Sequence, residues 1–257
     1  MATIQIIGSC SGTEAMPGRH HTSLVLTAGD RHYFFDAGEN CAYTAQLMGV
    51  DLLKTRAIFI SHPHFDHIGG LPGLLWHIRK LTNRRGENVA DSAVEVYLPQ
   101  RRFWDGLMQM VAETEGNFRC RFSLPTRLIT AGEIFDDGTV RVTAFENHHL
   151  PPTEDGNCQS YSFRIEADGR SAVFSGDVRD MDDLTATVGN SCDLLLCETG
   201  HHAVEDVCAF ADSHRVGRLV LLHHGREILE NRPSVGEALA ATATPTVLAE
   251  DEMTVAL

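Results

Sequence analysis

The sequence predicts an α/β fold in which two packed sheets are covered by helices. Three observations support this prediction. Short strand-like runs recur along the chain with turn residues between them, each half of the chain has several such runs with flanking helical segments, and no linker separates the halves. At 257 residues the chain can bury one sizeable core, so we expect a single domain spanning residues 1–257.

The first half alternates between strand-like and helix-like patterns. Its apolar or alternating runs end at Gly, Asp or Ser residues, which is typical of strands. Leucine and isoleucine recur at i, i+3, i+4 and i+7 over residues 71–78, which predicts an amphipathic helix. The predicted strands are 3–7, 23–27, 32–35, 57–60 and 94–98, and further helices are predicted at 43–50, which is short, and around 103–113.

The second half repeats the strand-rich pattern. One helix is predicted near residues 204–211, and two final strands, 246–249 and 253–256, are predicted to close the chain as a hairpin. The other predicted strands are 140–145, 160–165, 172–174, 193–197 and 219–222.

The composition disfavours a membrane protein and a disulfide-stabilised one. No apolar run approaches the ~20 residues of a membrane helix. The first residues, MATIQIIGSC, lack the basic segment and long apolar stretch of a signal peptide. The seven cysteines are scattered without a C-x-x-C pair, which argues against a disulfide framework and a cysteine-based zinc site. We therefore expect a cytoplasmic protein with no membrane association.

The charge disfavours a large nucleic-acid partner. The chain has 21 basic and 35 acidic residues, a net charge of −14, and would repel a phosphate backbone unless a basic patch or a bound metal offset the repulsion. One cluster of basic residues is a candidate patch, although a solvated face is the favoured interpretation. Its members are Arg79, Lys80, Arg84, Arg85, Arg101 and Arg102.

The segment SHPHFDHIGG, residues 61–70, concentrates metal-binding residue types. It places three histidines and an aspartate within six positions, directly after an apolar strand-like run. His62 and His64 form an i, i+2 pair on an extended loop, so both imidazoles can reach one ion. Asp66 and His67 then face a second ion nearby. Because imidazole and carboxylate are both zinc ligands, and packed imidazoles repel each other once protonated, the segment predicts a metal site.

Further histidine pairs lie along the chain, one of them in the first Gly-rich loop and others after strand-like runs, and one aspartate also follows such a run. Side chains at the ends of strands on one edge of a sheet converge in space. Asp177, directly after the run AVFSG, is the natural candidate to bridge two ions. Two ions about 3.5–4 Å apart polarise an ester or phosphoryl oxygen and generate a hydroxide at neutral pH. The pairs are His20/His21, His148/His149, His201/His202 and His223/His224.

These motifs resemble those of a known superfamily. SHPHFDHIGGLPGLL resembles the H-x-H-x-D-H motif of the metallo-β-lactamase superfamily, and its continuation is similar to the ribonuclease Z-like branch. IGSCSGTEAMPGRHHTS and YFFDAGEN are similar to that branch's opening Gly-rich loop and Asp-x-Gly turn. AVFSGDV resembles its S-G-D-T segment with Val178 in place of Thr, and RLVLLHHGRE resembles its L-V-L-T-H segment with Leu222 in place of Thr. The resemblance implies an αββα sandwich of two mixed sheets flanked by helices.

The resemblance also implies a set of metal ligands. One metal would be held by His62, His64 and His149, another by Asp66, His67 and His223, and Asp177 would bridge them.

Two of these ligands have a competing neighbour. His149 is preferred to His148 because FENHHLPP matches the family's F-x-x-N-H-x-x-P without a gap. His223 is preferred to His224 because it stands where the strand ends in the family pattern. The other histidine of each pair, His148 or His224, would either support a ligand or face the substrate.

A third histidine pair is the source of the expected proton donor. CETGHHAVEDVCAFA resembles the family's Glu…His-x-x-x-x-x-Ala segment, and the spacing to Ala211 favours His201 over His202, with a surface pair that caps a helix as the alternative. The catalytic residues expected in the site are Asp66 and His201. Residues that could orient the ligand imidazoles are Asp36 and Glu198.

The resemblance implies a hydrolase with two divalent metal ions, Zn²⁺ in preference to Mn²⁺ or Fe²⁺, in which a metal-bridging hydroxide attacks the substrate. We favour a phosphodiesterase acting on a small phosphodiester or cyclic phosphate. The branch's long arm for gripping transfer RNA has no counterpart, because the loops at 83–91 and 115–127 are short, and the charge is −14. The expected partner is therefore a small-molecule substrate rather than nucleic acid, and a homodimer is left open.

Three alternatives remain at this stage. They are a tRNA 3′-processing endoribonuclease similar to ribonuclease Z, a lactone or ester hydrolase using the same metals, and a non-hydrolytic metal-binding protein of the same fold. The superfamily's diiron oxidoreductases have a glutamate where His64 stands, which speaks against redox chemistry.

Overall fold

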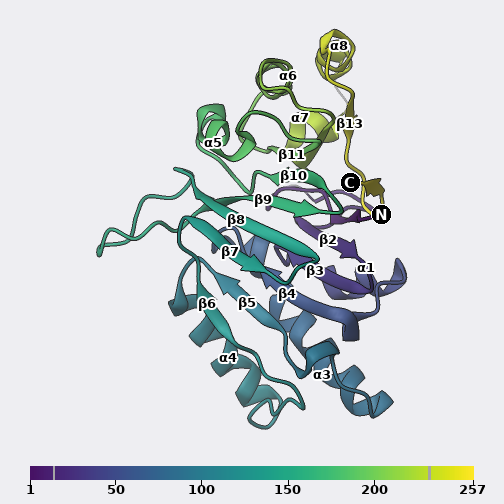
Figure 1. Cartoon of the computed structure of the whole chain (residues 1–257), viewed down its shortest axis with the longest axis vertical. Coiled ribbons are helices and arrows are strands. Elements are labelled where there is room, and N and C mark those ends of the chain that lie inside the picture. The colour runs from purple at the N-terminus through teal and green to yellow at the C-terminus, as the bar shows by residue number, and fades with distance from the viewer. Residues whose placement is uncertain (14, 231–232) are drawn as a thin grey trace.

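Two mixed β-sheets, packed face to face and flanked by helices, form the architecture of the chain (Figure 1). The computed structural model describes residues 1–13, 15–230 and 233–257. Each sheet has seven strands. This arrangement confirms the fold class that the sequence predicts.

The first sheet is built mainly from the N-terminal half of the chain. β1, β2 and β3 pair antiparallel, whereas β3, β4, β5 and β6 pair parallel. Because β3 to β6 run in the same direction, the segments that follow them leave from one edge of the sheet. In spatial order the strands are β14 (Thr254–Ala256), β1 (Thr3–Gly8), β2 (Ser23–Ala28), β3 (Arg31–Phe35), β4 (Thr55–Phe59), β5 (Glu95–Leu98) and β6 (Thr126–Leu128).

The second sheet is built from the C-terminal half. β7 to β10 pair antiparallel, and β10 to β13 pair parallel. In spatial order its strands are β13 (Thr246–Leu248), β12 (Leu219–His224), β11 (Leu194–Thr199), β10 (Arg170–Phe174), β9 (Tyr161–Ala167), β8 (Val140–Glu146) and β7 (Gly132–Asp136).

Helices cover the outer face of each sheet. Figure 1 shows α3 and α4 on the outside of the first sheet and α5, α6 and α8 on the outside of the second. Among the described residues, none of the helices has the length and apolar character needed to cross a membrane. The helices are α1 (Cys41–Leu47), α2 (Phe65–Ile68), α3 (Leu71–Arg85), α4 (Arg101–Thr114), α5 (Thr185–Val188), α6 (Val204–Ser213), α7 (Arg226–Leu229) and α8 (Pro233–Ala241), with short 3₁₀ turns at Leu52–Lys54, Ala90–Ser92 and Met181–Leu184.

Aromatic side chains fill the space between the two sheets. Phe59 of β4 stacks on Phe35 and on Tyr97, with ring centroids 5.0 and 4.9 Å apart, and meets Phe135 of the opposite sheet edge-on at 5.5 Å. Alternate residues of the same strands face the helices, so Ile58 lies in a separate apolar cluster. The central strands are therefore apolar on both faces, as buried parallel strands are.

Helix α3 is the amphipathic helix that the sequence predicts, and it continues beyond residue 78 to Arg85. Leu71, Leu74 and Ile78 are fully buried against the first sheet. The helix ends at Gly86, whose left-handed φ of 72° is a conformation that glycine adopts without steric cost. Its start lies directly after the histidine-rich segment, so the packing of α3 on the sheet also positions that segment.

The predicted hairpin at the C-terminus is wrong. Residues 246–249 and 253–256 do form strands, but β13 pairs parallel with β12 in the second sheet and β14 pairs antiparallel with β1 in the first. The connection between them crosses from one sheet to the other, and Asp251 anchors it by accepting hydrogen bonds from the Ser9 backbone and side chain at 2.9 and 2.7 Å. β13 therefore joins the preceding strand β12, and β14 joins the distant strand β1, instead of the two pairing with each other.

Two strands and one long connection are not predicted from the sequence. β6 is short and mostly exposed, and β7 has four of its five residues exposed or half-buried, so neither has an apolar pattern. The longest excursion in Figure 1 is the connection between β8 and β9, residues 147–160, which projects from the edge of the molecule. The connections that follow α3 and α4 carry no such arm.

The basic cluster lies on α3 and α4 and is largely paired with carboxylates. Within the described part of the chain, four of its six members form ion pairs, which favours the interpretation as a solvated face rather than a nucleic-acid patch. The pairs are Arg79–Glu115, Lys80–Glu115, Arg85–Asp51 and Arg101–Asp105.

We expect Phe59→Ala to lower the free energy of unfolding by about 3–5 kcal/mol, because it removes a fully buried ring from the space between the sheets. Urea unfolding followed by circular dichroism measures the change. Met110→Ala is the matched control, since this side chain on α4 is 52% exposed and should change stability little. Equal losses for the two variants would contradict this account of the core.

Candidate metal centre

Histidine and aspartate side chains from four segments meet at one edge of the two sheets. Three of the segments follow β4, β8 and β10, and the fourth is the end of β12. Every residue that the sequence analysis proposes as a metal ligand lies in this cluster. The loop after β4 and helix α2 supply His62, His64, Asp66 and His67, the loop after β8 supplies His149, the loop after β10 supplies Asp177, and the end of β12 supplies His223.

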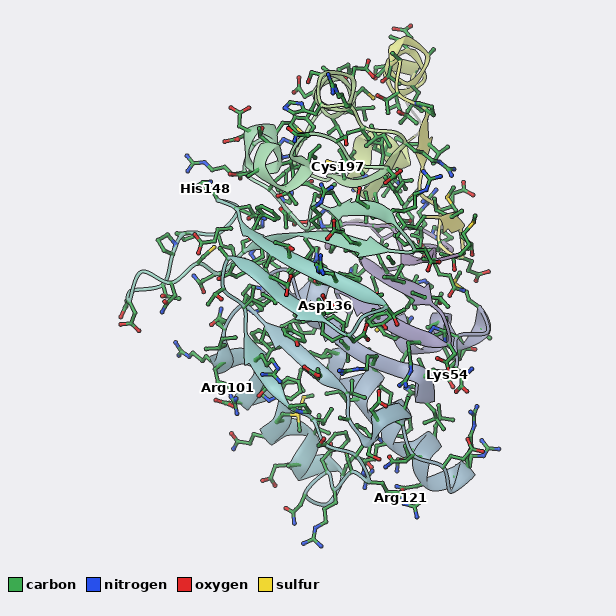
Figure 2. The ribbon with its side chains drawn as sticks, viewed as in Figure 1. Lys54, Arg101, Arg121, Asp136, His148 and Cys197 are labelled. Carbon is green, nitrogen blue, oxygen red and sulfur yellow. The ribbon has the colours of Figure 1, made fainter. Side chains whose placement is uncertain are left out.

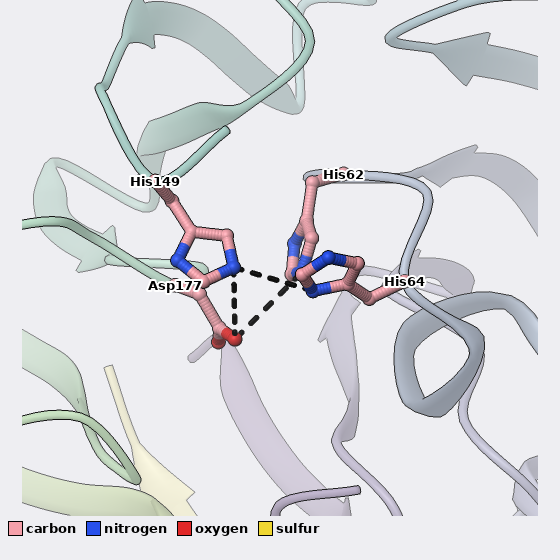
Figure 3. A group of neighbouring side chains, drawn as sticks. All are labelled: His62, His64, His149 and Asp177. Carbon is pink, nitrogen blue, oxygen red and sulfur yellow. Dashed lines mark hydrogen bonds and ion pairs between the residues drawn. The ribbon is translucent and has the colours of Figure 1, made fainter. Parts of the chain in front are cut away.

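The first group of donors contains three histidines and Asp177. Figure 3 shows His62, His64 and His149 converging on the Asp177 carboxylate. The Nε2 atoms of His62 and His149 each lie 3.7 Å from Asp177 Oδ2, and His149 Nε2 lies 3.2 Å from His64 Nδ1. One ligand atom from each of the four residues falls within 4.8 Å of the others, which is close enough for one ion to contact them all.

The second group contains Asp66, His67 and His223 and lies beside the first. His223 Nε2 is 3.2 Å and His67 Nε2 is 3.5 Å from Asp66 Oδ2. Both imidazoles also approach Asp177, at 3.5 Å for His223 and 3.4 Å for His67. Asp177 therefore lies between the two groups, with Oδ1 near His67 and Oδ2 near His62, His149 and His223.

Buried atoms without hydrogen-bond partners indicate that these groups fit divalent cations. His62 Nε2, His67 Nε2 and Asp177 Oδ1 are buried and make no hydrogen bond. A buried polar atom left in this state costs about 1–3 kcal/mol. A metal ion satisfies such atoms together, because imidazole nitrogen and carboxylate oxygen are the donors that Zn²⁺ prefers.

The electrostatics of the cluster also favour a positive ion. Burial and the neighbouring imidazoles hold the pKa of His62 well below its usual value, so this ring is neutral and keeps a lone pair for a metal. Burial opposes a charge on His67, yet Asp177 and Asp36 together raise the pKa of His67 well above its usual value. The carboxylates thus stabilise positive charge at the point where the two groups meet.

Asp36 holds His67 in position. This fully buried carboxylate accepts hydrogen bonds from Ser61 N and Ser61 Oγ, both at 2.7 Å, and from His67 Nδ1 at 2.6 Å. Because His67 Nδ1 donates to Asp36, its Nε2 is directed toward Asp66 and Asp177. This is how a carboxylate orients a metal-binding histidine from outside the ligand set.

Glu198 holds His201 at the exposed side of the cluster. Its Oε1 accepts a hydrogen bond from His201 Nδ1 at 3.0 Å and its Oε2 accepts one from the His201 backbone at 3.0 Å. This hydrogen bond raises the pKa of His201, whose side chain is 45% exposed and lies 3.8 Å from Asp177. His202 turns away, with its Nε2 3.0 Å from the carbonyl oxygen of Val178.

The pairs His148/His149 and His223/His224 also have one member in the cluster and one outside it. His148 points to the periphery (Figure 2), where its side chain is 75% exposed, and Asp183 raises its pKa through a hydrogen bond. His224 is buried beneath the site and its Nε2 donates to the carbonyl oxygen of Ala249 at 2.8 Å. Burial lowers the pKa of His224 to about 4. Neither residue joins the donor groups, whereas His149 and His223 do.

Gly200 is a part of the site that the sequence analysis did not single out. His223 has a left-handed φ of 53°, at a point where the register between β11 and β12 shifts. A Cβ atom at position 200 would lie 2.5 Å from His223 Nδ1, so only glycine leaves room for the ring in this position. The signal is weak in sequence, because the contact depends on the pairing of two strands.

Residues 2–243 match the family model described as anti-Pycsar protein Apyc1. The chain belongs to the anti-Pycsar protein Apyc1 family. Ribonuclease Z of Shouchella clausii is 24% identical, over 96% of this chain and 95% of its own length. Ribonuclease Z of Treponema pallidum is 46% identical over 66 residues, which is 26% of this chain and only 21% of that relative.

Solved structures show the same fold. The short form of human tRNase Z superposes with a TM-score of 0.75 at 22% identity, covering 99% of this chain and 98% of that one. The metallo-β-lactamase fold protein YhfI from Bacillus subtilis superposes with a TM-score of 0.74 at 17% identity, covering 99% and 98%. The Apyc1 family chain therefore has a metallo-β-lactamase fold and is similar to ribonuclease Z, which confirms the resemblance seen in its sequence.

We expect Gly200→Ala to weaken divalent-metal binding about 10- to 100-fold, because a methyl group would displace the His223 ring. Competition with a chromophoric zinc chelator measures the affinity. Gly225→Ala is the matched control, since a Cβ there meets its nearest atom at 3.5 Å, an ordinary contact. Unchanged zinc affinity in Gly200→Ala would contradict this view of how His223 is placed.

Proposed function

We propose that this chain is a dinuclear metal-dependent phosphodiesterase that acts on a small phosphodiester or cyclic phosphate. The observation that supports this proposal most directly is that two of the three donor groups lie side by side with Asp177 between them, the third being Asp177, His201 and His223. In this assignment His62, His64 and His149 hold one ion. The ligands of the other ion are Asp66, His67 and His223, with Asp177 common to both.

Each part of the site has a distinct task in this proposal. When bound, two divalent cations, Zn²⁺ in preference to Mn²⁺ or Fe²⁺, supply the Lewis acidity and the acidified water that phosphodiester hydrolysis requires at neutral pH. Asp66 and Asp177 supply the negative charge that binds those cations, and Asp36 keeps His67 Nε2 directed toward them. These contacts fix the ligands before substrate arrives, so little reorganisation accompanies the reaction.

His201 is the proton donor to the leaving group in this proposal. Its Nδ1 is engaged by Glu198, which leaves Nε2 free to donate at the exposed side of the cluster. The hydrogen bond to Glu198 favours the protonated imidazole, which is the form that a general acid needs. Asp177 lies 3.8 Å away and further stabilises this charge.

A small substrate is favoured over a large RNA by the charge and shape of the chain. The net charge is −14, and most of the basic cluster is already paired with carboxylates. The connections after α3 and α4 carry no long arm. Relatives named ribonuclease Z make tRNA 3′ processing the second candidate. Lactone or ester hydrolysis is a further outcome of the assays below.

We expect purified protein to contain two equivalents of divalent metal and to hydrolyse bis-p-nitrophenyl phosphate. Chelation with EDTA should abolish turnover. Asp177→Ala should lower both metal content and turnover, turnover by about 100-fold or more, because Asp177 lies between the two donor groups. Mass spectrometry of the metals and a colorimetric assay measure the two quantities.

A pair of neighbouring histidines provides the control for this experiment. His149→Ala should behave like Asp177→Ala, whereas His148→Ala, at an exposed position, should retain metal and turnover. Two bound metals without hydrolysis of any phosphodiester would overturn the proposed reaction and direct the assays to lactones and carboxylic esters. Loss of metal in His148→Ala but not in His149→Ala would overturn the ligand assignment.

We expect His201→Asn to reduce kcat about 10²- to 10⁴-fold for a phosphodiester with an alkyl leaving group, which needs a proton. The loss should be much smaller for bis-p-nitrophenyl phosphate, because p-nitrophenolate leaves without protonation. His202→Asn is the control, since this side chain faces Val178. An equal loss for both substrates would assign His201 a role other than proton donation.

The size of the substrate is tested with one enzyme preparation and two substrates. We expect a higher kcat/KM for a ribose cyclic phosphate than for a precursor tRNA with a 3′ trailer, because the acidic chain repels a polyanion. The comparison is made at two salt concentrations, so that the electrostatic contribution is measured. Preference for the precursor tRNA at both would favour the ribonuclease Z assignment.

A further inference from the structure

Asp183 carries a nearly buried carboxylate that the ligand assignment does not use. It belongs to the 3₁₀ turn Met181–Leu184, which follows β10. Its side chain is 5% exposed, although aspartate is rarely buried unless its charge is paired or hydrogen-bonded. Burial opposes the charge, yet hydrogen bonds from His148 and Arg179 hold the pKa of the Asp183 carboxyl below its usual value. The carboxylate is therefore ionised, and its hydrogen bonds account for its burial.

The hydrogen bonds of Asp183 join two loops that each carry a proposed metal ligand. Asp183 Oδ2 accepts one hydrogen bond from His148 N at 3.1 Å and another from Arg179 N at 3.2 Å. Oδ1 accepts a third from His148 Nδ1. His148 directly precedes His149, and Arg179 lies two residues after Asp177. One oxygen atom thus links the backbone beside His149 to the backbone beside Asp177.

The sheet itself does not make this connection. His149 follows β8 and Asp177 follows β10, and β9 lies between these two strands. The ladder hydrogen bonds therefore link β8 and β10 each to β9 and not to one another. Figure 3 shows the two side chains close together nonetheless, with His149 Nε2 3.7 Å from Asp177 Oδ2. The spacing of these donors therefore depends on contacts beyond the ends of the strands.

The turn that carries Asp183 is itself firmly held. Leu184, the next residue, is fully buried in the apolar cluster between the second sheet and its helices. Helix α5 follows directly, and the guanidinium of Arg164 on β9 donates hydrogen bonds to the carbonyl oxygens of Thr187 and Val188 at 3.3 and 2.8 Å. A carboxylate on a support of this kind can fix the position of two loops rather than follow them.

We propose that Asp183 is a positioning residue that fixes the distance between His149 and Asp177, so that both reach the same ion. This inference rests on the ligand assignment of the proposed function, in which both residues belong to the first donor group. Metal donors must be held within about 0.5 Å of their working geometry, and hydrogen bonds from outside the ligand set supply this order. The two backbone hydrogen bonds account for the effect, since His148→Ala leaves both in place.

Two substitutions of Asp183 separate geometry from charge. Asp183→Asn removes the charge but keeps an oxygen that can accept both backbone hydrogen bonds. Asp183→Glu keeps the charge but lengthens the side chain by a methylene, so the carboxylate cannot occupy the same place. We expect Asp183→Glu to weaken zinc binding about tenfold and Asp183→Asn to weaken it less than about threefold, measured by competition with a chromophoric chelator. Asp182→Asn, at an exposed position of the same turn, is the control and should bind zinc as the wild type does.

The order of the two affinities decides the proposal. Loss of affinity in Asp183→Asn but not in Asp183→Glu would show that the charge matters and the geometry does not, which overturns it. Equal affinities in the two variants, whether retained or lost, would overturn it as well. Urea unfolding of the zinc-free proteins should give the same midpoint for both. A midpoint that falls only in Asp183→Glu would assign Asp183 a general structural role instead.

The same measurements separate this inference from the proposed function. Chelator competition reports binding and needs no turnover. A protein that binds two zinc ions but hydrolyses no phosphodiester would refute the phosphodiesterase assignment, and the affinities of the two variants would still decide the positioning role. An active enzyme in which wild type, Asp183→Asn and Asp183→Glu bind zinc equally would refute the positioning role alone.

Discussion

The buried carboxylate of Asp177 is the constraint on which the arrangement of the site depends. It is 2% exposed and close to imidazoles carried by three other segments. An isolated carboxylate at such a depth would be expensive, and His223 and His67 offset this by holding its pKa well below the usual value. The two sheets must therefore pack so that the ends of β4, β8, β10 and β12 meet around the Asp177 carboxylate. Two further carboxylates lie outside the ligand set and each holds one histidine in place: Asp36 accepts a hydrogen bond from His67, and Glu198 accepts one from His201.

Most of the fold could be predicted from the sequence because its central strands are apolar on both faces. Residues 57–60 are the clearest case, since Phe59 faces the other sheet and Ile58 faces the helices. β6 and β7 lack this signal, because they lie at exposed edges. The final two strands were recognisable, but their pairing was not. β13 extends the second sheet beside β12 whereas β14 joins β1 in the first, and no local pattern encodes that choice.

The residues of the candidate site could be predicted from the sequence. The contacts that position some of them could not. The crowding of His62, His64, Asp66 and His67 has few explanations other than a metal, and the chain order of the remaining motifs matched a known superfamily. The geometry around His223 was not predictable, because it depends on a register shift between β11 and β12 and on the missing side chain of Gly200. Features of this kind arise from tertiary contacts and leave only a single glycine in the sequence.

The crossing of the C-terminal segment between the sheets has a consequence for synthesis on the ribosome. β1 pairs with β2, which follows closely in the chain, and with β14, which is made far later. The hydrogen bond from Leu257 N to the carbonyl oxygen of Ala2 joins the two ends of the chain at 3.0 Å. The first sheet is thus incomplete until residues 254–256 leave the exit tunnel, and one side of β1 stays unpaired until then. Closing so long a loop is entropically unfavourable, so this step should come late in folding.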